Sequence, residues 1–590
     1  MRLARRSLRF SLARFAAFAL FALGLLLLLF PAVGTRSLSL SAVGLAAFVG
    51  LVIVHDRVVR EERRAADLVR IQDEALARLA RDWGAMPLPG LPAATEPPPL
   101  ARDLNLLGRA SLLHLLGTAH TPPGKAALAS WLLAAAGPAE IALRQAAVAE
   151  LAPELDLRQE LEVRARPLER VPADVEPFLR WAEDRSWLPG WALALARLLA
   201  LLTVTAGVLL LADLLPLWPF LLLIVANLAL SYVYGKRMAA TFDRISAREG
   251  EFQLYAGVLG VVARRSFASP RLRGLGEDLA AEGVSAAAAL DLLHRRVVLS
   301  DTRHAALLHT PLQLLLLWDF HTLALLERWQ KDFGKKARRW LAALGELEAL
   351  AALGGLAHDN PEWTFPQVGS QERVTIEARG LGHPLLPDSA RVPNDVTLGP
   401  PGTFLLVTGS NMSGKSTLLR SLGVNVILAQ AGGPVCAESL RLPPLALATS
   451  ILVEDSLADG VSFFMAELLR IRKVVDAADR AAGEGRVLLY LLDEILRGTN
   501  TRERQIAVRR VLAHLLAARA LGAVSTHDLE LAEIPELAAA VRPVHFRESF
   551  EPGAEREGKP VMTFDYKLRP GVATTANALK LLDLVGLGEE

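Results

Sequence analysis

The sequence predicts a C-terminal α/β domain with a parallel sheet, preceded by a mainly α-helical region and by two apolar helical hairpins. Three observations support this prediction. After residue 366, short apolar runs that end in polar residues alternate with helix-forming segments, which is typical of buried parallel strands joined by helices. Segments rich in Ala, Leu and charged residues fill much of the chain before that point. Hydrophobic residues make up 52% of the chain, which is high for a soluble protein and indicates membrane-embedded segments.

The charge and the cysteine content exclude some classes of protein. The 65 Lys and Arg residues nearly balance the 63 Asp and Glu residues, which leaves a net charge of +2. A basic surface for nucleic acid would therefore have to be a local patch. Cys436 is the only cysteine, which excludes an internal disulfide and a cysteine-built zinc or iron–sulfur site.

Residues 1–55 contain the first predicted hairpin. No charged residue occurs between Arg14 and Arg36, and the stretch from Leu38 to Val54 is also uncharged. Each stretch is long enough to cross the hydrocarbon core as a helix, at about 1.5 Å per residue. A polar turn at residues 35–37 is expected between them. A cleaved signal peptide is the alternative, but its apolar region should be short and should not be followed by a second span.

Residues 187–236 contain the second predicted hairpin. Its first member runs from Leu198 to Ala212, extended backwards past Arg197, and its second runs from Leu214 to Gly235. Asp213 is expected at the turn between them. A buried hairpin in the protein core is the alternative, because the first member is short and carries an arginine.

Basic residues flank the outer ends of both hairpins, and this pattern predicts their orientation. The flanking residues are Arg2, Arg5, Arg6, Arg9 and Arg14 before the first span, Arg57, Arg60, Arg63 and Arg64 after the second, and Lys236 and Arg237 after the fourth. Because cytoplasmic flanks carry an excess of Lys and Arg, both termini and the C-terminal domain are expected in the cytoplasm of a multi-pass protein of the inner membrane.

The remaining chain divides by composition. Residues 56–100 predict a helix leaving the membrane and a Pro-rich linker, residues 101–186 and 237–365 predict helical regions, and residues 366–590 predict the α/β domain. A basic run in the second helical region either contacts phosphates or forms a solvated helix face. It consists of Lys331, Lys335, Lys336, Arg338 and Arg339.

A phosphate-binding motif follows the apolar run Phe404–Thr408. It has the form G-x-x-x-x-G-K-S and leads into a helical run, which is the context of a P-loop. Lys415 is expected to reach the β- and γ-phosphates of ATP, and Ser416 to ligate Mg²⁺. The expected nucleotide-binding residues here are Gly409, Ser410, Asn411, Met412, Ser413, Gly414, Lys415, Ser416 and Thr417.

Two further apolar runs end in polar residues that belong with the P-loop. Residues 487–492 are followed by Asp493 and Glu494, at the carboxyl edge of the predicted sheet. Asp493 is expected to hold Mg²⁺, and Glu494 to polarise the attacking water. Residues 521–524 lead to His527, which could sense a γ-phosphate by hydrogen bonding. Taken alone, the acidic pair could serve as a surface or capping feature and the histidine could be structural.

These motifs resemble those of the MutS DNA mismatch repair family. Asn411 and Met412 between the two glycines, the run DEILRGTNT from Asp493, the run STHD from Ser525 and the run YKLRPG from Tyr566 are all similar to family motifs. Residues 457–468 resemble the family's signature segment. A weaker likeness at residues 103–148 covers the start of the family's helical lever region, so the expected fold is an ABC/MutS-like P-loop NTPase domain preceded by levers.

The resemblance implies several functional residues and partners. It implies ATP hydrolysis with Mg²⁺, catalysed with Glu494, Lys415 and His527, and a homodimer in which Ser462 reaches the nucleotide of the partner subunit. Arg391 stands where the family usually has an aromatic residue against adenine, and it is expected to bind the nucleotide by stacking its guanidinium on the base. DNA is an implied partner, although the second hairpin occupies the place of a DNA clamp and the first hairpin the place of a mismatch-reading domain.

Two functions fit these observations. One is a membrane-anchored, MutS-like ATPase that works as an ATP-gated dimer on DNA and also contacts membrane lipid. The alternative is an ATP-driven membrane scaffold or transporter-like switch that does not bind DNA.

Overall fold

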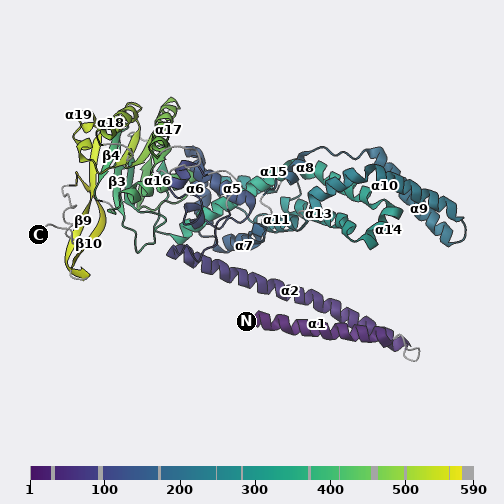
Figure 1. The fold of residues 1–590 in the computed structure, drawn as a ribbon. Helices are drawn as coiled ribbons and strands as arrows, with labels where there is room; N and C mark the ends of the chain where they lie inside the picture. The colour runs from purple at the N-terminus through teal and green to yellow at the C-terminus, as the bar shows by residue number, and fades with distance from the viewer. Residues whose placement is uncertain are drawn as a thin grey trace. The chain divides into compact units, whose positions relative to one another are not determined.

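The computed structural model describes residues 2–573 with internal gaps. These gaps are residues 28–33, 91–96, 171–173, 247–248, 281–282, 370–373, 411, 453–462, 485, 497–500 and 557–558. The chain forms two compact units, Met1–Pro87 and Leu88–Glu590 (Figure 1).

The first unit is an antiparallel pair of helices. Helix α1 (Arg2–Leu27) packs along α2 (Gly34–Ala80), with the rings of Phe18 and Phe48 5.7 Å apart. A side chain at Gly44 would collide with the backbone of Phe21, so the glycine permits this close approach. The prediction of a polar turn at residues 35–37 is wrong, because α2 already begins at Gly34. Ser and Thr favour the start of a helix as much as a turn.

The second unit begins with a mainly α-helical region, as the sequence predicts. Thr121 and Ser285 start two of its helices by accepting hydrogen bonds from the backbone N–H groups of Gly124 and Ala288. In chain order the helices are α3 (Pro99–Asp103), α4 (Leu112–Leu115), α5 (Pro122–Leu133), α6 (Pro138–Leu151), α7 (Leu155–Ala165), α8 (Glu176–Glu183), α9 (Gly190–Leu211), α10 (Leu217–Ser246), α11 (Glu249–Val262), α12 (Pro270–Leu279), α13 (Ala286–Ser300), α14 (Ala306–Leu316) and α15 (Trp318–Asp359).

Among the described residues, five helices are long and apolar enough to cross a membrane by length and composition alone. They are α1, α2, α9, α10 and α15. The apolar windows of the first four are between 6% and 22% buried within the protein, whereas that of α15 is 78% buried. Helix α15 is therefore a core helix of the second unit. Asp213, expected at a turn, does lie between α9 and α10.

Helix α15 packs against α5, α6, α8 and α12. Three of its glycines face the backbone or side chains of these neighbours. A Cβ at Gly334 would lie 2.0 Å from the carbonyl oxygen of Ala182, and one at Gly345 would lie 2.5 Å from that of Pro123. The helical region is thus assembled around one long, closely packed helix.

The C-terminal domain contains two sheets. The six-stranded sheet has the order β10-β9-β4-β8-β7-β6, in which only the pairing of β10 with β9 is antiparallel. Its strands are β4 (Thr403–Thr408), β6 (Leu445–Ser450), β7 (Val487–Asp493), β8 (Leu521–Ser525), β9 (Val541–Arg556) and β10 (Lys559–Pro570). The four-stranded sheet has the order β1-β5-β2-β3, with β1 (Gln367–Val368), β2 (Ile376–Leu381), β3 (Asn394–Leu398) and β5 (Ser439–Leu442).

Helices cover the larger sheet. Phe404, Tyr490 and Val524 share a buried cluster with α17 (Phe463–Gly483) and α18 (Thr501–Ala517). Helix α16 (Lys415–Ala431) packs on β7 and β8 and also contacts α5 and α6 of the helical region. The predicted mainly helical region followed by an α/β domain is therefore confirmed.

A buried carboxylate joins the helical region to the sheet domain. Asp103, at the end of α3, has no exposed surface. Its carboxylate accepts hydrogen bonds from the Thr449 hydroxyl (2.6 Å) and from the backbone N–H groups of Ile451 and Leu452 (3.2 and 2.9 Å), and it pairs with Arg470 at 2.6 Å. One side chain of the helical region thus holds the end of β6 and the first half of α17 together.

We expect Asp103→Ala to lower the free energy of unfolding of the second unit by about 3 kcal/mol, because Arg470 and three other donors would lose a buried acceptor. Chemical denaturation in detergent measures the change. Asp332→Ala is the matched control, since its pair with Arg328 is exposed and should be worth less than about 1 kcal/mol. Equal, small effects of both substitutions would contradict the structural role of Asp103.

Candidate nucleotide site

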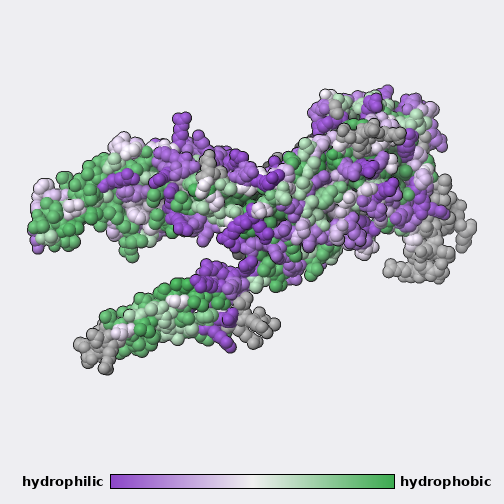
Figure 2. Space-filling model, turned by 180° about the vertical axis from the view of Figure 1, so that it is seen from behind, coloured by the Kyte–Doolittle hydropathy of each residue, from purple (hydrophilic) through white to green (hydrophobic). Residues whose placement is uncertain are grey.

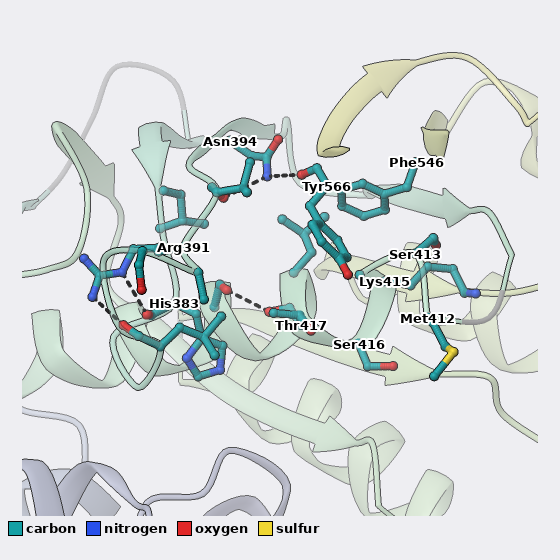
Figure 3. Close-up of a pocket in the computed structure, with 18 of the residues that line it drawn as sticks. His383, Arg391, Asn394, Met412, Ser413, Lys415, Ser416, Thr417, Phe546 and Tyr566 are labelled. Atoms are coloured by element: carbon teal, nitrogen blue, oxygen red, sulfur yellow. Dashed lines mark hydrogen bonds between the residues drawn. The ribbon is translucent and has the colours of Figure 1, made fainter. Parts of the chain in front are cut away.

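A cavity of about 650 Å³ opens beside the loop between β4 and α16 (Figure 3). The loop residues Ser413, Gly414, Lys415 and Ser416 line one end, together with Glu494. Residues from β2, β3 and the segment between them line the other end, and Phe546 and Tyr566 of β9 and β10 complete it. The cavity is thus shared by both sheets.

The backbone of the β4–α16 loop adopts conformations that suit glycine. Gly409 and Gly414 have φ angles of 141° and 106°, and Met412 has a φ of 68°. A Cβ at Gly409 would lie 2.8 Å from the Ser413 hydroxyl oxygen, so the loop also needs the space. The predicted residue Asn411 lies outside the described residues. This winding loop directs backbone N–H groups and the amino end of α16 towards one place, which favours an anion.

Lys415 lies at the centre of the loop. Its side chain is buried, and its Nζ donates hydrogen bonds to the carbonyl oxygens of Gly409 and Ser410, each at 2.9 Å. The same Nζ is 3.7 Å from Glu494 Oε1 and 3.5 Å from His527 Nε2. The ammonium group is therefore held inside the loop, next to the carboxyl ends of β7 and β8.

The acidic pair lies where β7 ends. Strand pairing sets Asp493 beside Ser525, whose hydroxyl donates a hydrogen bond to the Asp493 carboxylate. The Glu494 backbone N–H donates to the Ser525 carbonyl oxygen at 3.1 Å, and Glu494 has a φ of 47°. Its carboxylate Oε1 is 2.7 Å from His527 Nε2. The structure thus brings together Lys415, Glu494 and His527, which lie far apart in the sequence.

The residues present fit a nucleotide phosphate. Among the described residues, the hydroxyl groups of Ser410 and Ser413 are buried and have no hydrogen-bond partner, as expected if they donate to a ligand. The Ser416 hydroxyl lines the same cavity. Mg²⁺ is often bound by one or two protein groups together with substrate phosphates. Ser416 and Asp493 fit that pattern, and the described residues include no separate cluster of three or more His, Cys, Asp or Glu.

The opposite end of the cavity is lined by Arg391 and His383 (Figure 3). The Arg391 guanidinium donates hydrogen bonds to the carbonyl oxygens of His383 (3.2 Å) and Leu386 (2.6 Å), and it lies 5.5 Å from the centre of the Trp363 ring. Arg391 therefore lines the cavity as a fixed group of its own loop. Burial lowers the pKa of His383 to about 4, with the positive charges of Arg420 and Arg391 acting in the same direction, so this ring is neutral at pH 7.

Tyr566 also lines the cavity, although the sequence motifs predict no site role for it. A Cβ at Gly414 would lie 3.2 Å from its ring, and its carbonyl oxygen accepts a hydrogen bond from the Asn394 side chain at 2.9 Å. Figure 3 shows the Tyr566 ring between Phe546 and the loop residues. Its position depends on the pairing of β9 and β10, which shifts register between Phe564 and Leu568. The run YKLRPG that begins at Tyr566 resembles a family motif, but no local sequence signal predicts the strand register that brings its ring to the loop.

The predicted site residues are thus placed in three ways. Ser410, Met412 and Ser413, with the two loop glycines, form the loop, and Lys415, Ser416 and Thr417 form the first turn of α16. Glu494 and His527 lie beside Lys415, and Asp493 ends β7 with its carboxylate bonded to the Ser525 hydroxyl. Arg391 lines the far end of the cavity. The signature serine, Ser462, lies outside the described residues, as does residue 411.

Comparison with known proteins agrees with this architecture. Residues 405–590 match the family model MutS domain V. The chain is 32% identical to the DNA mismatch repair protein MutS of an Exiguobacterium species, over 44% of this chain and 29% of that protein. It is 33% identical to the DNA mismatch repair protein MutS 2 of Halobacterium salinarum, over 42% of this chain and 27% of that protein. It is 32% identical to the DNA mismatch repair protein MSH6 of Arabidopsis thaliana, over 43% of this chain and 20% of that protein.

The matched region spans less than a third of the length of these relatives. It contains the P-loop, the acidic pair after β7 and the histidine after β8. The C-terminal region of this chain, residues 405–590, is therefore a MutS domain V.

Proposed function

We propose that the chain is a Mg²⁺-dependent ATPase that converts ATP and water to ADP and phosphate. The observation that carries the proposal is the cluster of Lys415, Glu494 and His527 at the mouth of the P-loop. Loop N–H groups and the amino end of α16 cradle the phosphates, and Lys415 neutralises charge on the β- and γ-phosphates. Ser416 and Asp493 would hold Mg²⁺, which would supply further neutralisation of the phosphate charge.

The hydrogen bonds at the edge of the sheet give each remaining side chain a distinct role. Glu494 accepts a proton from the attacking water, and it is kept in place by its own backbone bond to Ser525. His527 contacts the same carboxylate at 2.7 Å, so it couples the position of Glu494 to any group that binds its ring. The contact between Glu494 Oε1 and Lys415 Nζ is loose, at 3.7 Å. A γ-phosphate that enters the loop can therefore take the place of Glu494 beside the Lys415 ammonium group.

We expect Glu494→Gln to reduce the ATP hydrolysis rate by about 10²- to 10⁴-fold with little change in nucleotide affinity, because the amide cannot accept the proton while the loop stays intact. Steady-state hydrolysis and binding of a fluorescent ATP analogue measure the two quantities. Glu484→Gln, at an exposed position of the same domain, is the matched control. Lost binding with unchanged turnover of bound nucleotide would reverse the assigned role.

The membrane anchor is part of the same proposal. The α1–α2 pair in the first unit and the α9–α10 pair in the second span the inner membrane, with both termini and the MutS domain V in the cytoplasm. Large apolar side chains on these helices are exposed, and apolar residues cover much of the visible surface of both pairs in Figure 2. At the base of α9 and α10, the Arg237 guanidinium lies 4.3 Å from the Trp187 ring centre, an arrangement that suits the membrane interface.

An ATP-gated homodimer completes the active site in this proposal. The support is the MutS-like sequence around Ser462, whose hydroxyl would reach the nucleotide of the partner subunit. Each subunit alone then holds an incomplete site, and confinement to a membrane raises the local concentration of partners.

Mixed dimers of Ser462→Ala and Lys415→Ala subunits are expected to regain part of the wild-type hydrolysis rate, whereas each variant alone is inactive. The mixed dimer holds one site with an intact P-loop from the first chain and an intact serine from the second. Hydrolysis by co-purified, differently tagged pairs measures the effect, and a Ser462→Ala pair with two tags is the control. Mixed pairs as inactive as either parent would refute the shared site.

DNA is the proposed partner because the matched relatives are named DNA mismatch repair proteins. The basic run on α15 offers limited support. Arg338 pairs with Glu176 and Glu183 at 3.0 and 2.7 Å, and Arg339 pairs with Asp278. These carboxylates offset two of the positive charges that a phosphate backbone would need, which favours the alternative of an ATP-driven scaffold or switch that does not bind DNA.

We expect DNA to bind with an affinity that falls steeply with salt, because neutralising each phosphate releases counterions. Titrations of matched, mismatched and branched duplexes against detergent-solubilised protein, with and without ATP, measure this. Glu176→Gln with Glu183→Gln should strengthen binding by freeing Arg338. Salt-independent or undetectable binding in all conditions would leave the scaffold as the function.

A further inference from the structure

Helix α14 (Ala306–Leu316) lies beside the α9–α10 pair but is too short to cross a membrane. None of its residues is buried. Leu307 is 97% exposed and Leu308 is 55% exposed, which is unusual for side chains of this type in water. The helix therefore presents an apolar face that continues the apolar surface of α9 and α10.

The inner side of α14 is fastened to the middle of α10 by polar side chains. Asn227, which has no exposed surface, donates hydrogen bonds from Nδ2 to the Leu314 carbonyl oxygen (2.7 Å) and to the Thr203 hydroxyl (3.0 Å). Gln313 Nε2 donates to the Ser231 hydroxyl at 2.9 Å. The Leu314 carbonyl is one of the last four of its helix, which ordinarily turn to water or to a capping group. Here a buried amide supplies the partner, as a water-free environment requires.

The chain reverses at Leu317. This residue is fully buried, has a φ of 50°, and joins α14 to α15. Just beyond it, the Phe320 ring packs against that of Tyr234, whose centre is 5.6 Å away. Before α14, the Arg303 guanidinium lies 4.7 Å from the Phe242 ring centre, nearer the end of α10. The chain thus advances along α10 from the level of Phe242 to that of Asn227 and then returns.

The position of Asn227 along α10 gives the depth that this segment reaches below the base of the hairpin. Asn227 lies ten residues before Arg237, the basic residue at the base of the hairpin, which corresponds to about 15 Å along a helix. This is about half of the roughly 30 Å hydrocarbon core. Asp319, two residues past Leu317, is paired: His309 Nε2 lies 2.9 Å from its Oδ1 and Arg303 Nε lies 3.9 Å from its Oδ2, as is expected for ionisable groups close to the hydrocarbon core.

We propose that α14, Leu317 and the first turn of α15 form a re-entrant segment that enters the cytoplasmic half of the bilayer and contacts lipid acyl chains through Leu307, Leu308 and Leu315. The inference rests on the proposed membrane span of α9 and α10. It adds a third lipid-contacting element, one connected directly to the long core helix α15.

Site-directed labelling tests the proposal, since Cys436 is the only cysteine and is buried. In a Cys436→Ser background, Leu307→Cys and Leu315→Cys would each carry an environment-sensitive fluorophore. Leu222→Cys, on the exposed side of α10, is the membrane control, and Ile506→Cys, on α18, is the aqueous control. The full-length protein is reconstituted in vesicles of phosphatidylcholine and phosphatidylglycerol.

Quenching by lipids brominated on the acyl chain should reach at least half the Leu222→Cys value at positions 307 and 315, and quenching by aqueous iodide should be several-fold weaker than at position 506. Iodide quenching equal to that at position 506, with lipid quenching retained at position 222, would overturn the re-entrant segment alone. Loss of lipid quenching at position 222 as well would overturn the membrane span and the re-entrant segment together.

Adding Asn227→Leu to the Leu315→Cys protein keeps the branched shape and the number of non-hydrogen atoms of the side chain but removes the donor to the Leu314 carbonyl. Iodide quenching at position 315 should rise at least twofold, because the unpaired carbonyl draws the end of α14 towards water. Unchanged quenching would show that Asn227 does not hold the segment at its depth. The probe at position 222 reports whether the hairpin itself remains inserted.

Discussion

The second unit depends on the burial of α16. This helix is apolar on nearly all sides, so it is stable only when other elements cover it completely. The sheet covers one side through β7 and β8, and α5 and α6 cover the other. A Cβ at Gly423 would lie within about 3 Å of both Leu104 and Leu491, so the helical region and the sheet meet at this point. The P-loop, at the amino end of α16, is therefore fixed by contacts from both regions.

Buried polar side chains connect these elements by hydrogen bonds. Asn425, fully buried in α16, donates to the Gly382 carbonyl oxygen at 2.9 Å and accepts from the Cys436 backbone N–H at 2.7 Å. Asp103 makes a similar set of bonds between α3 and the end of β6. Such groups are costly to bury unless every bond is made, so they specify one arrangement of the elements around them.

Local sequence signals predict much of the fold and of the candidate site. The strand, loop and helix from Phe404 onwards, the acidic pair after β7 and the apolar α9–α10 pair all follow from residues that are neighbours in the chain. Local sequence signals do not predict the contacts between distant segments. Tyr566 reaches Gly414, and Asp103 reaches Arg470, only because strand register and helix packing bring them together. The sequence also does not predict α14 as a membrane-embedded element, because its eleven residues are too few to span a membrane.

Helix α15 gives the second unit a mechanical property. It is a single stiff rod of 42 residues, about 63 Å long. Near one end, Phe320 packs on Tyr234 of α10, and near the other, Leu353 would touch a side chain added at Gly433, just after α16. Between these ends, α15 packs closely against its neighbours at Gly334 and Gly345. A stiff rod with contacts at both ends would turn a small rotation near α16 into a larger sideways displacement near α10, and a displacement near α10 would act back on the P-loop helix.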